Sequence, residues 1–113
     1  IHGYSLGFKF VFEAETLDHR NWVYDFGDMG FVKDFLEDNF DHIMMIASDD
    51  PRKQDLYNLD GIAEIRELPV VGCEAFAKEV FSFCQQHFED DRVKVKSVRV
   101  FEHGANSAVF GNF

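Results

Sequence analysis

The 113-residue sequence is poor in several residue types, and each shortage argues against a class of protein. It has only two cysteines, too few for a disulfide framework, and no apolar run near the roughly 18 residues that a membrane span needs. Lys and Arg number 11 against 21 Asp and Glu, which gives a net charge of −10. Because phosphate backbones select basic surfaces, we expect no nucleic-acid partner. Because no apolar run is long enough, we expect no membrane partner either.

The two cysteines, Cys73 and Cys84, fall on one expected helix, which separates them by roughly 16 Å at the usual rise per residue. A disulfide requires Cα atoms within about 7 Å of each other, so both residues are expected to be free thiols. Free thiols favour a reducing compartment, and no signal peptide opens the sequence. The cytoplasm is therefore the expected location.

Apolar periodicity predicts the secondary structure. Alternating residues predict strands, and helical spacing predicts one helix from about residue 31 and a second from about residue 72. The segment 41–68 is expected to be irregular. In the third strand the apolar phase shifts between Val95 and Val98, which predicts a β-bulge. The predicted strands are 4–12, 22–26, 92–102 and 107–113.

The resulting order, ββααββ, predicts an α+β fold. Two hairpins would form an antiparallel four-stranded sheet with both helices on one face. Hydrophobic residues make up 46% of the chain and include 14 Phe, enough for one core, so residues 1–113 are expected to form a single domain. The open edges of such a sheet must be paired or covered, which favours a homo-oligomer.

Three polar positions could carry chemistry. His2 heads the first strand, where it is either a structural residue or a ligand. In Asp41-His42 a carboxylate could orient an imidazole for acid–base work, or the pair could simply form a turn after the first helix. Glu102 ends an apolar strand. Its carboxylate could accept the paired N–H and NH2 groups of a pterin or guanine, or could be solvated.

Five segments, in order along the chain, resemble the motifs of the 6-pyruvoyl-tetrahydropterin and 6-carboxy-tetrahydropterin synthase family. They are His2-Gly3-Tyr4-Ser5, Trp22–Met29, Phe40-Asp41-His42, Val71–Glu74 and Val98–Glu102. The resemblance implies the T-fold (tunnelling fold), in which strands from three subunits close a barrel and trimers pair into hexamers. It also implies a lyase whose substrate is the pterin triphosphate 7,8-dihydroneopterin triphosphate.

The resemblance further implies roles for individual residues. Asp41 and His42 would form the catalytic acid–base dyad. Glu102 would bind the 2-amino/N3 edge of the pterin, and the backbone at Gly72 and Cys73 would help to hold the ring. The family's catalytic cysteine and one zinc ligand precede the position of Ile1, so the domain is expected to lack that segment.

The same resemblance implies a zinc cofactor, with His2 as one ligand. Zn2+ would hold the side-chain hydroxyls of the substrate and acidify the neighbouring carbons. Tyr4 stands where the family has a second zinc histidine, and a neutral tyrosine is a poor zinc ligand. The alternative function is therefore a catalytically altered paralogue that binds a pterin or purine.

Basic residues are concentrated in the third expected strand, which holds four of the 11. If the substrate is a triphosphate, some of them are expected to face the barrel interior or the phosphate entrance and to create a local positive field. The alternative is an ordinary solvated strand face. The four residues are Arg92, Lys94, Lys96 and Arg99.

Overall fold

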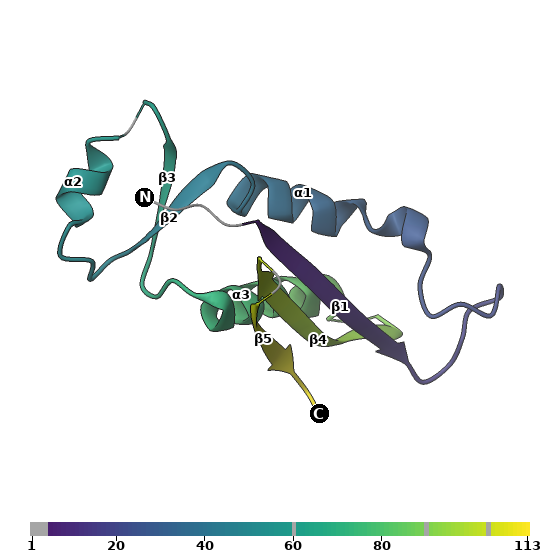
Figure 1. Cartoon of the computed structure of the whole chain (residues 1–113). Helices are drawn as coiled ribbons and strands as arrows, with labels where there is room; N and C mark the ends of the chain where they lie inside the picture. The colour runs from purple at the N-terminus through teal and green to yellow at the C-terminus, as the bar shows by residue number, and fades with distance from the viewer. Residues whose placement is uncertain (1–4, 60, 90, 104) are drawn as a thin grey trace. The chain divides into compact units, whose positions relative to one another are not determined.

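The structure is a computed structural model that describes residues 5–59, 61–89, 91–103 and 105–113. Its helices and mainly antiparallel strands confirm the α+β class (Figure 1). The chain divides into two compact units, residues 1–26 with 72–113 and residues 27–71. In chain order the elements are β1 (Leu6–Ala14), the 3-10 helix η1 (Phe26–Asp28), α1 (Gly30–Asn39), β2 (Ile43–Ala47), α2 (Lys53–Tyr57), β3 (Glu64–Leu68), α3 (Cys73–His87), β4 (Val93–Glu102) and β5 (Asn106–Gly111).

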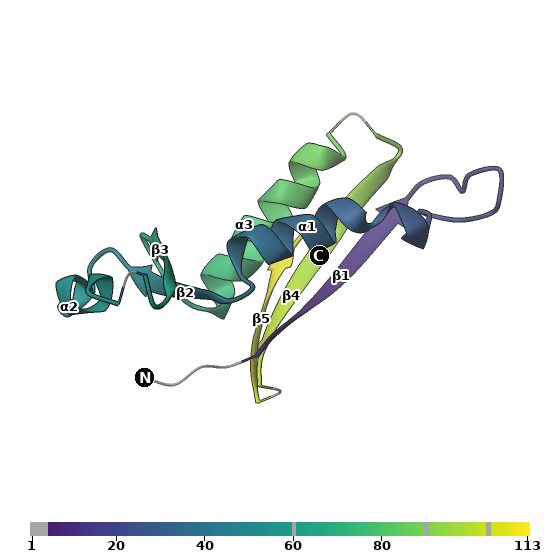
Figure 2. The ribbon, with the colours of Figure 1, turned by 90° about the horizontal axis from the view of Figure 1, so that it is seen from above.

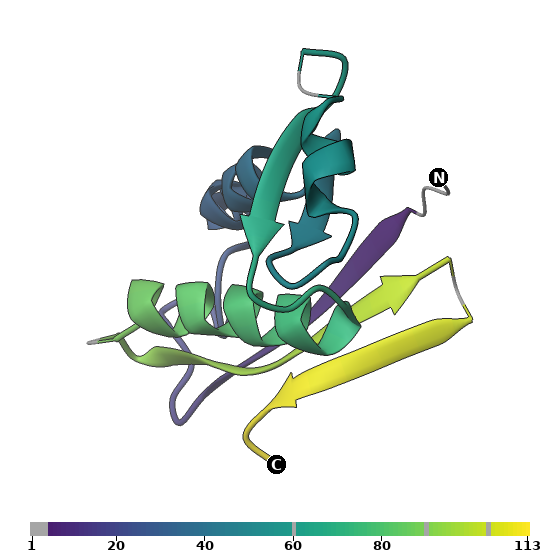
Figure 3. The same ribbon diagram turned by 90° about the vertical axis from the view of Figure 1, so that its left-hand side faces the viewer.

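The larger unit is a three-stranded antiparallel sheet in the order β1-β4-β5, with α3 along one face (Figures 2 and 3). The expected four-stranded sheet is wrong, because residues 22–26 form a loop that enters η1 and not a second strand. The strand that pairs with β1 is β4, 79 positions later at the Ala14↔Val93 pair. The β4–β5 hairpin at the end of the chain is confirmed.

A β-bulge in β4 determines which face of the sheet Glu102 occupies. Val11 pairs with Ser97 and Phe12 with Val95, so Lys96 is the extra residue, and the predicted bulge is confirmed. Simple alternation from Val95 would turn Glu102 away from α3. The extra residue resets the phase, so that positions 98, 100 and 102 share the helix-facing side with positions 93 and 95.

Gly111 of β5 lies against this bulge. Asn112 N–H donates to Lys96 O at 2.9 Å, and a Cβ added at Gly111 would lie 2.2 Å from the same oxygen. The backbones of β4 and β5 therefore approach each other too closely for any side chain at position 111, as is common for glycine in a strand beside a bulge.

The core of this unit lies between α3 and the sheet. The inward stripe of α3 includes Ala77, Val80 and Cys84, all with 0% exposure, opposite the equally buried Val98 and Val100 of β4. Both cysteines are free, as expected, and both are buried. None of the helices formed by the described residues has the length and apolar character that a membrane-spanning helix requires.

The unit of residues 27–71 contains a small parallel sheet, which corrects the expectation of an irregular segment over 41–68 (Figure 1). Strands β2 and β3 pair from Ile43↔Glu64 to Ala47↔Leu68, and α2 lies in the connection between them. β2 is five apolar residues without alternation, and β3 has only two, so neither shows the period of two that identifies a strand.

Candidate functional site

Two of the expected site residues meet within the larger unit. Cys73 begins α3 and Glu102 ends β4, and Sγ of Cys73 lies 3.7 Å from Oε2 of Glu102. An ionised carboxylate can only accept, so the thiol donates. Cys73 is buried and Glu102 is half-buried, paired with Leu6 on one side and Asn106 on the other.

The thiol of Cys73 is held in its protonated form. Burial raises its pKa, the charge and hydrogen bond of Glu102 raise it further, and the charge of Glu74 adds to the same effect. Because the thiolate and not the thiol is the nucleophile, this environment makes Cys73 a hydrogen-bond donor and a poor nucleophile.

Gly72 provides the N-cap of α3 next to this pair. Its backbone has φ 157° and ψ 166°, a region that is essentially restricted to glycine. Its carbonyl accepts the N–H of Phe76 at 3.0 Å and so begins the helix. The first N–H groups of a helix have no acceptor within it. Cys73, whose Sγ lies 3.7 Å from Oε2 of Glu102, is the first residue of α3. A planar ligand with donors beside acceptors would suit this combination.

Asp41 and His42 lie in the other unit, directly after α1. Oδ1 of Asp41 is 3.0 Å from Nδ1 of His42, so the two neighbouring side chains do face each other. The side chains are 61% and 92% exposed, respectively. His42 has φ 56°, a left-handed conformation that turns the chain from the helix end into β2. With Nδ1–H donated to the carboxylate, Nε2 of the imidazole is left for other partners.

The turn that carries this dyad is attached to β3 through Arg66. The guanidinium stacks over the Phe40 ring at 5.3 Å and donates to the carbonyl of Asn39 at 3.0 Å. Asn39 is the last residue of α1, where a cation complements the helix dipole. Partial burial lowers the pKa of Arg66, which stays protonated. Arg66 thus connects the end of α1, just before the Asp41-His42 turn, to β3.

The expected zinc ligand, His2, and the neighbouring Tyr4 lie outside the described residues. Within residues 5–59, 61–89, 91–103 and 105–113, no group of three or more His, Cys, Asp or Glu side chains could hold a metal ion. The described part of the chain therefore supplies no ligand set that fits zinc.

Two of the four basic residues near β4, Arg92 and Lys94, hold separate segments of the fold together. Arg92 donates to the carbonyls of Thr16 and Val23, the latter at 2.8 Å, and Lys94 donates to the carbonyls of Phe88 and Glu89. These bonds satisfy backbone carbonyls in the loop after β1 and at the end of α3. No sequence pattern predicted them. Arg99 lies instead on the sheet face opposite α3. Its neighbour in the strand register is Lys9 of β1, and its guanidinium donates to the Ser107 hydroxyl at 3.2 Å.

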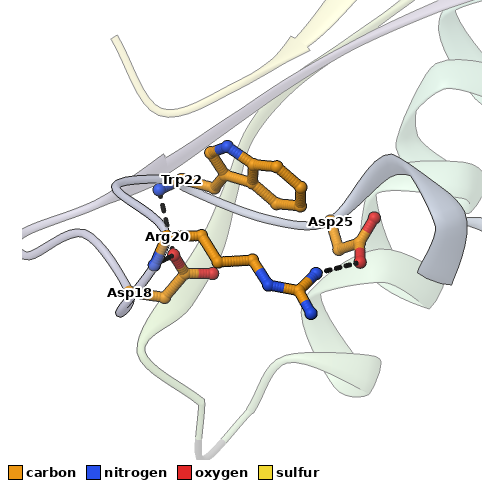
Figure 4. Close-up of polar contacts among 4 residues, drawn as sticks. All are labelled: Asp18, Arg20, Trp22 and Asp25. Carbon is orange, nitrogen blue, oxygen red and sulfur yellow. Dashed lines mark hydrogen bonds and ion pairs between the residues drawn. The ribbon is translucent and has the colours of Figure 1, made fainter.

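The loop between β1 and η1 has its own polar scaffold (Figure 4). Asp18 accepts the backbone N–H groups of Arg20 at 2.8 Å and Trp22 at 3.0 Å, an Asx-type turn. The hydrogen bond from Trp22 is the main reason that the pKa of Asp18 is lowered. The Arg20 guanidinium lies over the Trp22 ring at 5.2 Å and 3.4 Å from Asp25. The loop is therefore an ordered turn, and it continues into residues 22–26, where a strand was expected.

Sequence reasoning missed the side-chain contact between Cys73 and Glu102. It assigned Cys73 a role through its backbone alone, because 29 positions separate the two residues and no periodicity relates them. The available signal was the phase shift in β4. If the alternation is continued from Val98 to the end of the strand, Glu102 falls on the apolar side of the sheet, which a helix would cover.

Comparisons with known proteins match the chain over almost its whole length. Residues 1–112 match the family model described as 6-pyruvoyl tetrahydropterin synthase. The crystal structure of an uncharacterized protein from Wolinella succinogenes is similar, with a TM-score of 0.84 and 20% sequence identity. The match covers 99% of this chain and 79% of that chain, and it shows a shared fold. A search of the curated proteins found no match.

Proposed function

We propose that this chain, which belongs to the 6-pyruvoyl tetrahydropterin synthase family, is a lyase that acts on 7,8-dihydroneopterin triphosphate. Its product class would be that of the 6-carboxy- or 6-pyruvoyl-tetrahydropterin synthases. The observation that supports this proposal best is the proximity of Glu102 to the start of α3, where Sγ of Cys73 lies 3.7 Å from Oε2 of the carboxylate. An anionic acceptor beside helix N–H donors suits the edge of a pterin.

In this proposal Glu102 is the anchor of the ring. Its carboxylate accepts the 2-amino and N3–H groups of the pterin as two parallel, charge-assisted hydrogen bonds. The backbone at Gly72 and Cys73 holds the ring from the helix side. The glycine-only conformation of Gly72 keeps this approach free of a side chain.

The Asp41-His42 pair is the proposed acid–base dyad. Asp41 accepts the Nδ1–H of His42 and so favours the tautomer with a free Nε2 lone pair. Nε2 is then the atom that takes a proton from a side-chain carbon of the substrate and returns one. Both side chains are exposed, so substrate can reach them.

Zinc belongs to the proposal only through the family. When bound, it would polarise the hydroxyls of the substrate side chain, with His2 as one proposed ligand. Tyr4, at the position of a family zinc histidine, favours the second candidate, a catalytically altered pterin- or purine-binding paralogue. Metal analysis of the purified full-length protein, run beside a turnover assay, separates the two. Bound zinc with consumption of 7,8-dihydroneopterin triphosphate identifies the lyase, and pterin binding without turnover identifies the paralogue.

The proposal includes a homo-oligomer with the T-fold arrangement. In the described sheet β1 and β5 are the two edge strands, and sheet edges must be paired or covered. We expect light scattering at micromolar concentration to give the mass of a trimer or hexamer. A monomeric mass would contradict this part of the proposal.

Replacing Glu102 by Gln tests the anchor. The substitution keeps the shape of the side chain but removes its charge, so the charge-assisted hydrogen bonds to the pterin are lost. Each such bond is worth about 1.5–3 kcal/mol, so pterin affinity is expected to fall about tenfold or more. Titration followed by pterin fluorescence measures it. Glu89→Gln, an exposed carboxylate after α3, is the matched control and should bind as the parent does. Equal affinity for Glu102→Gln and the parent would refute the anchor.

A further inference from the structure

The side chain of Cys73 makes a contact that the proposed role of its backbone does not use. Its Sγ atom lies 3.7 Å from Oε2 of Glu102, within hydrogen-bonding range for sulfur. The packing of α3 on β4 fixes the positions of both residues, Cys73 and Glu102. One turn along α3, Ala77 has 0% exposure, and so does Val100, two residues before Glu102. The donor and acceptor are therefore brought together by the core, before any ligand binds.

The chemistry of the contact follows from the surroundings of the thiol. Cys73 is 8% exposed, and the negative charges of two carboxylates, Glu102 and Glu74, oppose a thiolate there. A neutral thiol beside an ionised carboxylate can only donate to it. The bond therefore runs from S–H to Oε2, and Oε1 makes no part of it.

We infer that Cys73 is a positioning residue, whose S–H orients the Glu102 carboxylate so that Oε1 and the remaining lone pair of Oε2 meet the planar N–H edge of the ligand. The inference rests on the proposed pterin-binding role of Glu102. A carboxylate at the end of a long side chain otherwise rotates freely, and ordering it on binding costs affinity. A donor already fixed on α3 removes part of that cost.

The competing explanation is packing alone, since a buried cysteine also behaves as a small hydrophobic residue. The two explanations differ for conservative replacements. Serine retains a donor at the same position, whereas alanine retains only the size of the Cβ. If packing alone matters, alanine should be tolerated at least as well as serine. If donation matters, serine should rescue what alanine loses.

The experiment compares pterin affinity, by fluorescence titration, in the parent chain and in Cys73→Ala, Cys73→Ser, Cys84→Ala and Glu102→Gln. Cys84 is the matched control, because it is a second buried thiol on the same helix and lies far along α3 from Glu102. A thiol is a weak donor, so Cys73→Ala is expected to weaken binding about 3- to 10-fold. Cys73→Ser should bind within about twofold of the parent, and Cys84→Ala should bind as the parent does although thermal unfolding detects its lost packing.

The outcomes separate this inference from the function on which it rests. If Glu102→Gln weakens binding while Cys73→Ala binds as the parent does, the positioning role is wrong and the anchor stands. The positioning role also fails if Cys73→Ser does not fold, or binds as weakly as Cys73→Ala. If the parent does not bind pterin, or if Glu102→Gln binds as the parent does, the proposed function is wrong, and the inference about Cys73 is then wrong as well.

Discussion

Replacing His42 by Ala is expected to lower turnover of 7,8-dihydroneopterin triphosphate by about 10²- to 10⁴-fold, the usual contribution of a general acid–base. The imidazole is 92% exposed and bonded to Asp41 at 3.0 Å. Its removal therefore leaves no cavity, and the fold should not weaken. Pterin affinity should also be unchanged, because the proposed anchor is Glu102. The measurement is kcat, with pterin titration alongside it.

Two further variants make the His42 experiment specific. Asp41→Asn should lower kcat while it leaves the imidazole in place, because a neutral amide no longer favours the tautomer with a free Nε2. His19→Ala removes another exposed histidine, in the loop after β1, and should leave kcat unchanged. Parent-like turnover by His42→Ala would remove His42 from the mechanism. Weakened pterin binding in the same variant would instead indicate that His42 contacts the ring.

Replacing Phe88 by Ala is expected to lower the free energy of unfolding by about 3–5 kcal/mol, the range for truncating a large buried aromatic side chain. Phe88 is 1% exposed at the C-cap of α3. Its ring meets Phe12 of β1 at 5.5 Å and Tyr24 of the loop at 5.2 Å, both edge-on. One side chain thus joins helix, sheet and loop, and its removal leaves a cavity that all three border.

Urea unfolding followed by circular dichroism measures the Phe88 effect. The matched control is Phe113→Ala, which removes the same ring from an 87% exposed position and should change the free energy of unfolding by less than about 0.5 kcal/mol. A loss of under about 1 kcal/mol for Phe88→Ala would mean that the site collapses around the missing ring and that this aromatic cluster contributes little to stability.

The prediction from sequence succeeded where the signal was local. The apolar stripe of α3, the alternation along β1 and the β4–β5 hairpin each lie within one short segment, and all three elements were found. Even the bulge at Lys96 was visible, because it displaces the apolar phase within a single strand. Free thiols at Cys73 and Cys84 followed from their spacing on one helix.

The errors arose where distant segments decide the structure. Residues 22–26 have the aromatic and β-branched composition of a strand. The partner of β1 is nevertheless β4, and the carbonyl of Val23 accepts a hydrogen bond from Arg92, 69 positions later. The short strands β2 and β3 exist because they pair with each other across α2. Five residues of either strand alone do not carry enough signal to distinguish it from a loop.

The candidate site shows the same division. The residue types and their order can be read from the sequence: a carboxylate at the end of an apolar strand, a glycine before a helix and an Asp-His pair after another helix. The folded chain was needed to show that Glu102 faces α3, because one extra residue in β4 turns it there. It was also needed to show that the buried thiol of Cys73 lies 3.7 Å from the carboxylate. Periodicity gives each residue a face of its own element. Packing and register decide which other element that face meets, and they depend on the whole chain.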